Sequence, residues 1–120
     1  MADIKATLTD LKNIDGILGA CVVDHSSGMA LGQVGGGVDL ELAAAGNSEV
    51  VKAKLKTMKS LGIEGAIEDI LITLGDQIHI IRPSVKNKDI FVYVVLDKAK
   101  ANLALARRKV FDIEIAFDKV

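Results

Sequence analysis

Asp24, His25, Ser26 and Ser27 supply the residue types of a hydrolase triad at four consecutive positions. A triad works only when its side chains converge, with the base oriented by a third group and hydrogen-bond donors aimed at the oxyanion. Neighbours in one tight turn rarely converge, whereas Asp and Ser often bond to the turn backbone. We therefore expect Asp24 and Ser26 to bond the turn, His25 to face water, and the group to be non-catalytic.

The run Gly35-Gly36-Gly37 stands before a predicted helix, where phosphate-binding loops also stand. It lacks the Gly-Lys-Ser/Thr ending of such loops, and Asp39 and Glu41 put negative charge where a phosphate would sit. The run therefore predicts a flexible connection at which the chain moves on binding.

His79 and Cys21 are the remaining residues that could do chemistry. His79 lies in an alternating run with Gln77 and Ile81, and no ligand spacing for a metal surrounds it. Cys21 is the only cysteine, lies among small and apolar residues, and has no basic neighbour to lower its pKa. We expect no catalytic residue, no metal and no cofactor. A single cysteine also excludes an internal disulfide and favours a reducing, cytoplasmic setting.

Length and composition predict one domain spanning residues 1–120. Half of the residues are hydrophobic but only 3% are aromatic, so the core must be aliphatic. A net charge of −1 gives no attraction to nucleic acid, and we interpret Arg107-Arg108-Lys109 as a solvated helix face. The N-terminus lacks the basic start of a signal peptide, and no apolar run reaches the roughly 18 residues of a membrane span, so we expect no membrane insertion.

Hydrophobic periodicity and turn residues predict helix, two strands, helix, three strands, helix. Asp3, Asp39 and Asp97 are the expected helix caps. Residues 111–118 alternate like a strand, yet Ile113 and Phe117 continue the apolar stripe of the last helix (Ala99, Leu103, Ala106 and Val110), which favours a helix. The predicted ranges are 3–13, 17–24, 29–34, 39–60, 67–74, 77–82, 90–96 and a last helix from 97.

The helix at 39–60 has an unusually wide apolar arc. We assign Glu41, Ser48, Lys52, Lys56 and Lys59 to its polar stripe. Leu40, Ala43, Ala44, Asn47, Val51, Leu55 and Met58 wind along one side, and Leu42, Gly46, Val50 and Ala53 along another, so the arc predicts burial on two sides. The strand at 67–74 contains no Lys, Pro or Gly to protect an edge, so it is either internal to the sheet or paired with another chain.

Local sequence patterns resemble the roadblock family over nearly the whole chain. The first strand is opened by Gly residues, carries small and apolar residues into an Asp and turns at a Gly, as Gly16, Gly19, Ala20, Val22, Val23, Asp24 and Gly28 do. The last strand runs into Asp97, and Ala101-Asn102-Leu103 resembles the family's helix start. The resemblance implies an α+β sandwich with a five-stranded antiparallel sheet and helices on both sides, ordered α-β-β-α-β-β-β-α, as in the roadblock/profilin-like fold.

The resemblance also implies a homodimer in which the long helices pack together and the third strands pair edge to edge. For the dimer interface we expect Leu42, Gly46, Val50, Ala53, Ile70 and Ile72. The implied function is a non-catalytic adaptor of a Ras-like small GTPase, as scaffold or activating partner. The alternatives are a purely structural dimerisation module that holds extended peptides, and a small-ligand sensor.

Overall fold

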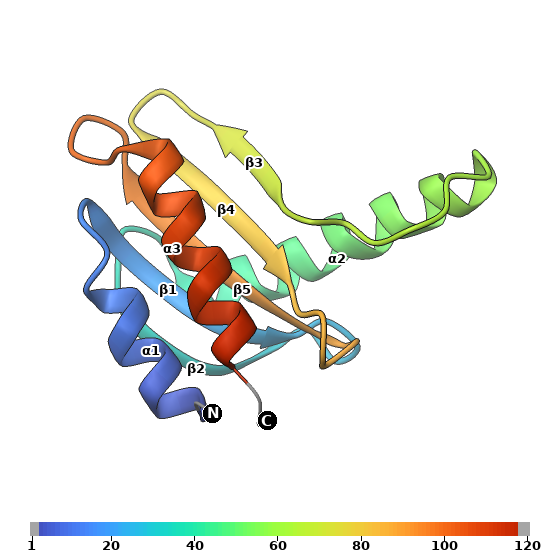
Figure 1. The fold of residues 1–120 in the computed structure, drawn as a ribbon, viewed down its shortest axis with the longest axis horizontal. Helices are drawn as coiled ribbons and strands as arrows, with labels where there is room; N and C mark the ends of the chain where they lie inside the picture. Colours follow the sequence, from blue (N-terminus) through green and yellow to red (C-terminus); the bar gives the residue numbers. More distant parts are fainter. Residues whose placement is uncertain (1–2, 118–120) are drawn as a thin grey trace.

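The computed structural model describes residues 3–117 (Figure 1). The elements follow the predicted order and are, in sequence, α1 (Ile4–Lys12), β1 (Ile17–Asp24), β2 (Met29–Gly35), α2 (Leu40–Ser60), β3 (Ile70–Thr73), β4 (Gln77–Pro83), β5 (Ile90–Asp97) and α3 (Leu103–Ala116). The strands form one antiparallel sheet in the order β2-β1-β5-β4-β3. The predicted α+β fold class is confirmed.

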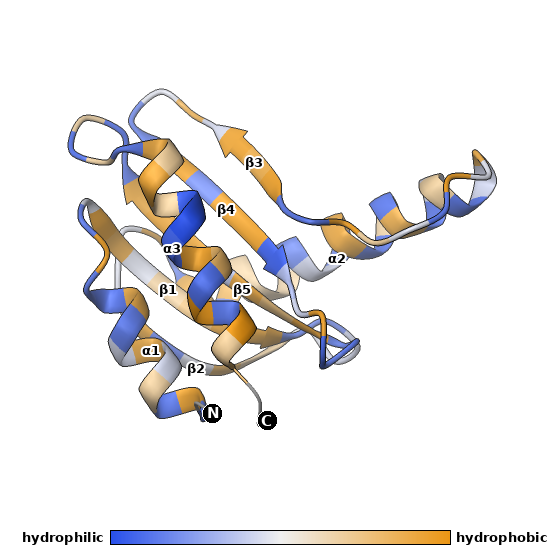
Figure 2. Cartoon of the chain, in the orientation of Figure 1, coloured by the Kyte–Doolittle hydropathy of each residue, from blue (hydrophilic) through white to orange (hydrophobic). Residues whose placement is uncertain are grey.

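Helices cover both faces of this sheet, with α1 and α3 on one face and α2 on the other (Figure 1). Neighbouring residues of a strand point to opposite faces, so β1 gives Ala20 and Val22 to one core and Cys21 and Val23 to the other. Because both faces of β1 and β5 are covered, these central strands are apolar at almost every position, as Figure 2 shows.

The helix caps are confirmed at the first two helices and wrong at the third. The amide of Ala6 donates to Asp3 at 2.9 Å, and that of Leu42 donates to Asp39 at 3.1 Å. Asp97 instead bonds the amide of Ala99 in a turn, and Asn102 caps α3 by accepting from Leu105 at 3.0 Å. The helix therefore starts later than predicted, and Ala99 lies outside its apolar stripe.

Helical structure continues through the tail as far as Ala116, which confirms the favoured helix over the alternating strand. Phe117 is fully buried and completes the core beneath α3. Asp118 and the last two residues lie outside the described residues.

The third strand is shorter than predicted, since only Ile70–Thr73 pair with β4 rather than residues 67–74. β4 ends at Pro83, whose ring nitrogen has no hydrogen to donate to a longer ladder. The two residues before β3 bond to arginine side chains instead of to β4. Arg82 donates to the Glu68 carbonyl, and Arg107 pairs with the Asp69 carboxylate.

Candidate functional site

The outer side of α2 is an apolar surface without a covering element in the described chain. Leu40, Ala44, Ser48 and Val51 are the buried residues of α2 and face the sheet. The four predicted interface residues of α2 lie on another side and are exposed, with Leu42 at 71% and Val50 at 39%. A Cβ added at Gly46 would meet nothing within 4 Å, so a second helix backbone has room to approach there.

The C-terminal half of α2 extends beyond the sheet (Figure 1). Residues 52–57 are all exposed. Leu55 on the helix, and Leu61 and Ile63 just after it, are exposed at 42%, 65% and 53%. Large apolar side chains on a projecting helix typically mark an interaction site. Leu55 lies one turn after the buried Val51, so it continues the sheet-facing stripe of α2 past the sheet and adds a second exposed apolar region to the outer side.

The two edges of the sheet differ in how they are protected. At the β2 edge, the register shifts so that Val22 pairs Gly32 and Val23 pairs Ala30, which leaves Leu31 as an extra, bulged residue. A bulge twists an edge strand and discourages pairing. The β3 edge pairs β4 in unbroken register and carries Leu71, which is 38% exposed. β3 is therefore the edge better suited to accept another strand.

Ile70 and Ile72, the predicted interface residues of β3, are both half-buried in the single chain. Ile70 contacts the core beneath α2. The structure thus brings part of the predicted set to one accessible helix side and the rest to the sheet edge. Their contacts with a second copy stay a prediction.

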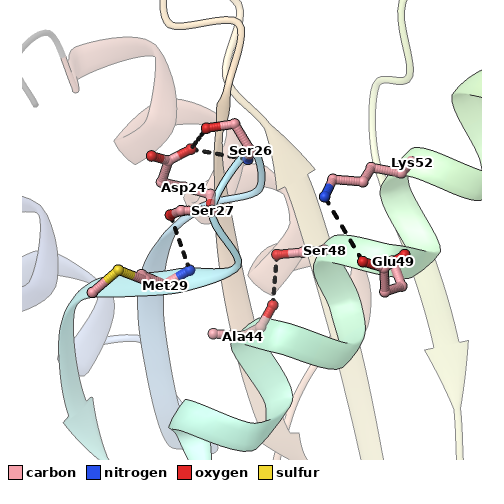
Figure 3. Close-up of polar contacts among 8 residues, drawn as sticks. All are labelled: Asp24, Ser26, Ser27, Met29, Ala44, Ser48, Glu49 and Lys52. Carbon is pink, nitrogen blue, oxygen red and sulfur yellow. Dashed lines mark hydrogen bonds and ion pairs between the residues drawn. The ribbon is translucent and has the colours of Figure 1, made fainter.

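Ser48 was assigned to the polar stripe of α2, and this assignment is wrong. It is 1% exposed and donates its hydroxyl hydrogen to the Ala44 carbonyl at 2.7 Å (Figure 3). The local bond satisfies the hydroxyl, which lets a polar residue occupy the sheet-facing side.

The Asp24–Ser27 turn holds no converging triad. Asp24 accepts from the Ser26 hydroxyl at 2.6 Å and the Ser26 amide at 3.0 Å, as predicted, and these bonds hold the pKa of Asp24 below its ordinary 3.8 (Figure 3). The expectation that His25 faces water is wrong, since the ring is 9% exposed, stacks on Phe91 and places Nε2 3.0 Å from the Lys88 carbonyl oxygen. His25 is thus directed away from Ser26, toward the loop before β5.

The glycine run is tied down on both sides. Gly36 donates its amide to the Leu18 carbonyl at 2.8 Å, and the Gly37 carbonyl accepts from Gln77 at 3.2 Å. A Cβ at Gly19 would collide with the Gly36 carbonyl oxygen, so the first strand needs glycine there. Tight packing thus replaces the expected loose connection in the single chain.

Cys21 is fully buried, and burial raises its pKa to about 12. The thiol is therefore protonated at neutral pH and is a core residue, not a nucleophile. Among residues 3–117, no group of three or more His, Cys, Asp and Glu side chains could hold a metal ion. No helix in that range is both long and apolar enough to cross a membrane.

His79 joins a hydrogen-bonded row that links the sheet to the loop before α2. Gln77 Oε1 can only accept, so His79 Nε2 donates to it at 2.9 Å and the neutral Nδ1 accepts from the Tyr93 hydroxyl at 2.9 Å. Burial lowers the pKa of His79 and raises that of Tyr93 to about 12. Both rings are therefore neutral at pH 7, which this row requires.

We expect the stability of the fold to decrease as the pH falls below 6.5. The unfolded chain takes up a proton on His79 near its ordinary pKa of 6.5, whereas the folded chain does so only at lower pH. Stability is thus full above pH 6.5 and is lost between that value and the lowered pKa. Urea unfolding between pH 7.5 and pH 5 should show this slope in the wild type and a weaker one in His79→Gln. Equal slopes would contradict the assignment.

Sequence reasoning missed a buried ion pair beneath α3. Arg82 and Glu114 are 6% and 0% exposed, and their Nε and Oε1 atoms are 3.0 Å apart. The other carboxylate oxygen of Glu114 accepts from the Val85 amide at 3.3 Å. Glu114 lies four residues after Val110 on the apolar stripe of α3, and this position was the available signal. An acid on such a stripe needs a buried basic partner.

Arg107 and Arg108 were interpreted as parts of a solvated face, and both are exposed, but Arg107 also makes an ion pair with the segment before β3 that sequence reasoning missed. Its guanidinium makes two parallel bonds to Asp69, at 2.7 Å and 3.1 Å. The side chain of Arg108 is 71% exposed, pairs with Asp112 on its own helix at 3.3 Å, and places its guanidinium carbon 5.4 Å from the Phe111 ring centre.

Comparison with known proteins adds a structural likeness. No sequence family and no curated protein matches the chain. The fold is similar to a Roadblock/LC7 domain from Streptomyces avermitilis, with TM-score 0.78 and 12% identity over 94% of this chain and 92% of that one. It is also similar to MglB from Myxococcus xanthus, with a TM-score of 0.73 and 15% identity over 90% of this chain and 82% of that one. A third similar structure is the gliding protein MglB from Thermus thermophilus, with a TM-score of 0.68 and 16% identity over 90% of this chain and 85% of that one.

These likenesses, together with the element order and the sheet topology, define the class of fold. The chain has the roadblock fold, as the local sequence patterns predicted.

Proposed function

We propose that this chain is a non-catalytic, homodimeric adaptor that binds a Ras-like small GTPase. The observation that carries the proposal is the exposed apolar side of α2, with Leu42 and Val50, on a roadblock fold. An exposed apolar surface of this kind typically marks a site where another protein binds. Its single buried cysteine and its net charge of −1 favour work in the cytoplasm and without nucleic acid.

In the proposed dimer, two copies of β3 pair edge to edge and the sheets join into one. The unbroken register of β3 supports this choice over the bulged β2. Antiparallel pairing of β3 with its copy would bring the projecting halves of both α2 helices to the same side. We place Leu42, Gly46, Val50, Ala53, Ile70 and Ile72 in the interface.

The proposed adaptor contributes no catalytic group of its own. His25 bonds a backbone carbonyl, and Cys21 is a buried thiol, so neither is available to substrate. A partner of this kind can still accelerate GTP hydrolysis by holding the GTPase's own residues in their reactive arrangement, because orientation alone lowers a barrier. The function is therefore either that of a scaffold or that of an activator.

We expect the chain to bind a Ras-like GTPase of its own organism in a nucleotide-dependent way. Switch segments of such GTPases are ordered by the γ-phosphate, so a surface that contacts them distinguishes the two nucleotide states. Calorimetry with the GDP form and with a non-hydrolysable GTP form measures the preference. Faster hydrolysis on addition of the chain identifies an activator, and nucleotide-dependent binding at an unchanged rate identifies a scaffold.

A structural dimerisation module is the second candidate, favoured by an open groove of about 500 Å³ beside the β2 edge. The groove is lined by Gly28, Met29, Ala30, Gly32, Gln33 and Glu41, and Met29 is 64% exposed. An extended peptide fits such a groove better than a folded partner does. Capture of peptides without any GTPase binding would favour this candidate. A small-ligand sensor would instead show a rise in melting temperature with one metabolite.

A further inference from the structure

Two arginine side chains hold the segment that leads into β3. Arg82 Nη1 donates to the Glu68 carbonyl at 2.8 Å. Arg107 Nε and Nη2 donate to the two carboxylate oxygens of Asp69 at 2.7 Å and 3.1 Å. Glu68 and Asp69 directly precede Ile70, the first residue of β3. We call these four residues, Arg82, Glu68, Arg107 and Asp69, the arginine latch.

The latch connects the edge strand to the α3 side of the sheet. Arg82 is fixed from below by Glu114 at 3.0 Å, and its guanidinium carbon lies 4.5 Å above the Phe111 ring centre. Arg107 is carried by α3 itself. A cleft of about 320 Å³ lies between α3 and the segment, with Glu68, Ala104 and Phe111 among its walls. Charged hydrogen bonds across the cleft therefore help to place this segment.

Precise placement matters at this edge because β3 is only four residues long. A slip of one residue against β4 would turn every side chain of β3 to the other face of the sheet and would change the edge that a second copy meets. Ile70 and Ile72 would then leave the α2 side, and Leu71 would take their place. A short strand has few ladder bonds to resist such a slip, so contacts outside the strand must fix its position.

We propose that the arginine latch fixes the position at which β3 is presented to a second copy of the chain, so that Arg107 and Asp69 are positioning residues for dimerisation. The inference rests on the proposed homodimer. Asp69 lies before the strand and Arg107 lies on α3, so neither residue is part of the pairing edge. The α3 surface thereby controls an interface that it does not touch.

Arg107→Gln is expected to raise the dimer Kd about tenfold, because each dimer depends on two latches and an exposed pair contributes a few-fold each. Sedimentation equilibrium measures the Kd. The matched control is Arg108→Gln, since Arg108 is the next residue on α3 but its ion pair is with Asp112 of the same helix and not with the segment before β3. Its Kd should equal that of the wild type. Reversing the pair, with Arg107→Asp and Asp69→Arg together, should recover most of the affinity.

Hydrogen exchange separates positioning from general stability. In Arg107→Gln, amides of residues 68–73 should exchange faster while the melting temperature stays near that of Arg108→Gln. If the wild type dimerises and both variants share its Kd, the latch proposal is overturned while the homodimer stands. If the wild type is monomeric at all concentrations, the homodimer proposal fails and takes the latch proposal with it.

Discussion

Glu114→Ala is expected to lower the free energy of unfolding by about 3–5 kcal/mol, since it leaves a buried cation without its partner. Arg82 is 6% exposed, and its Nε has its bond only to Glu114 among the described residues. The substitution also removes the acceptor of the Val85 amide and opens a cavity beneath α3. Urea unfolding followed by circular dichroism measures the loss.

Two variants test whether the unpaired charge is the cause. Arg82→Met combined with Glu114→Leu removes both charges at similar volume and should be within about 2 kcal/mol of the wild type, or more stable than it. Asp112→Ala breaks the exposed pair with Arg108 and should change stability by less than about 1 kcal/mol. A double variant as unstable as Glu114→Ala would show that shape, not charge, sets the cost.

Val50→Asp is expected to convert the proposed dimer into a folded monomer. Val50 is 39% exposed in the single chain, so a carboxylate there stays hydrated and the fold is kept. Inside the proposed dimer the same carboxylate would be buried at a cost of several kcal/mol. The dimer Kd should rise more than about a hundredfold. Light scattering gives the mass, and circular dichroism confirms that the variant is folded.

Lys59→Glu is the control for Val50→Asp. Lys59 is exposed on the polar stripe of the same helix, and helical spacing turns it well away from Leu42, Gly46, Val50 and Ala53. This substitution changes the charge by at least as much but should leave the mass unchanged. Dimeric Val50→Asp, or monomeric Lys59→Glu, would place the contact on a different side of α2.

The element order was predictable because each element carries its own periodicity and stop signals. Asp3 and Asp39 are followed by helical spacing, and the central strands are apolar because helices cover both of their faces. The start of the last helix was predicted too early, at residue 97, because Asp97 and Asn102 are both residue types that cap helices well. The chain uses the later one, since Asp97 is already bonded to the amide of Ala99 in a turn.

The polar contacts of the α3 side could not be predicted in the same way. Arg82 meets Glu114 across 32 positions, and Arg107 meets Asp69 across 38. Such pairs depend on how α3 lies over β4, which local patterns do not specify. The same limit applies to β3, whose length is decided by Pro83 in its neighbour and by side chains that reach Glu68 and Asp69. The second apolar side of α2 could be predicted, because an apolar arc wider than one face follows from the sequence of that helix alone.

Binding of a GTP-loaded Ras-like GTPase to the wild-type chain and to Val50→Asp tests the central claim most directly. The adaptor proposal predicts that the wild type binds one nucleotide form more tightly and that the monomeric variant loses most of this affinity. Absence of binding by the wild type to either nucleotide form of every such GTPase in its organism would contradict it.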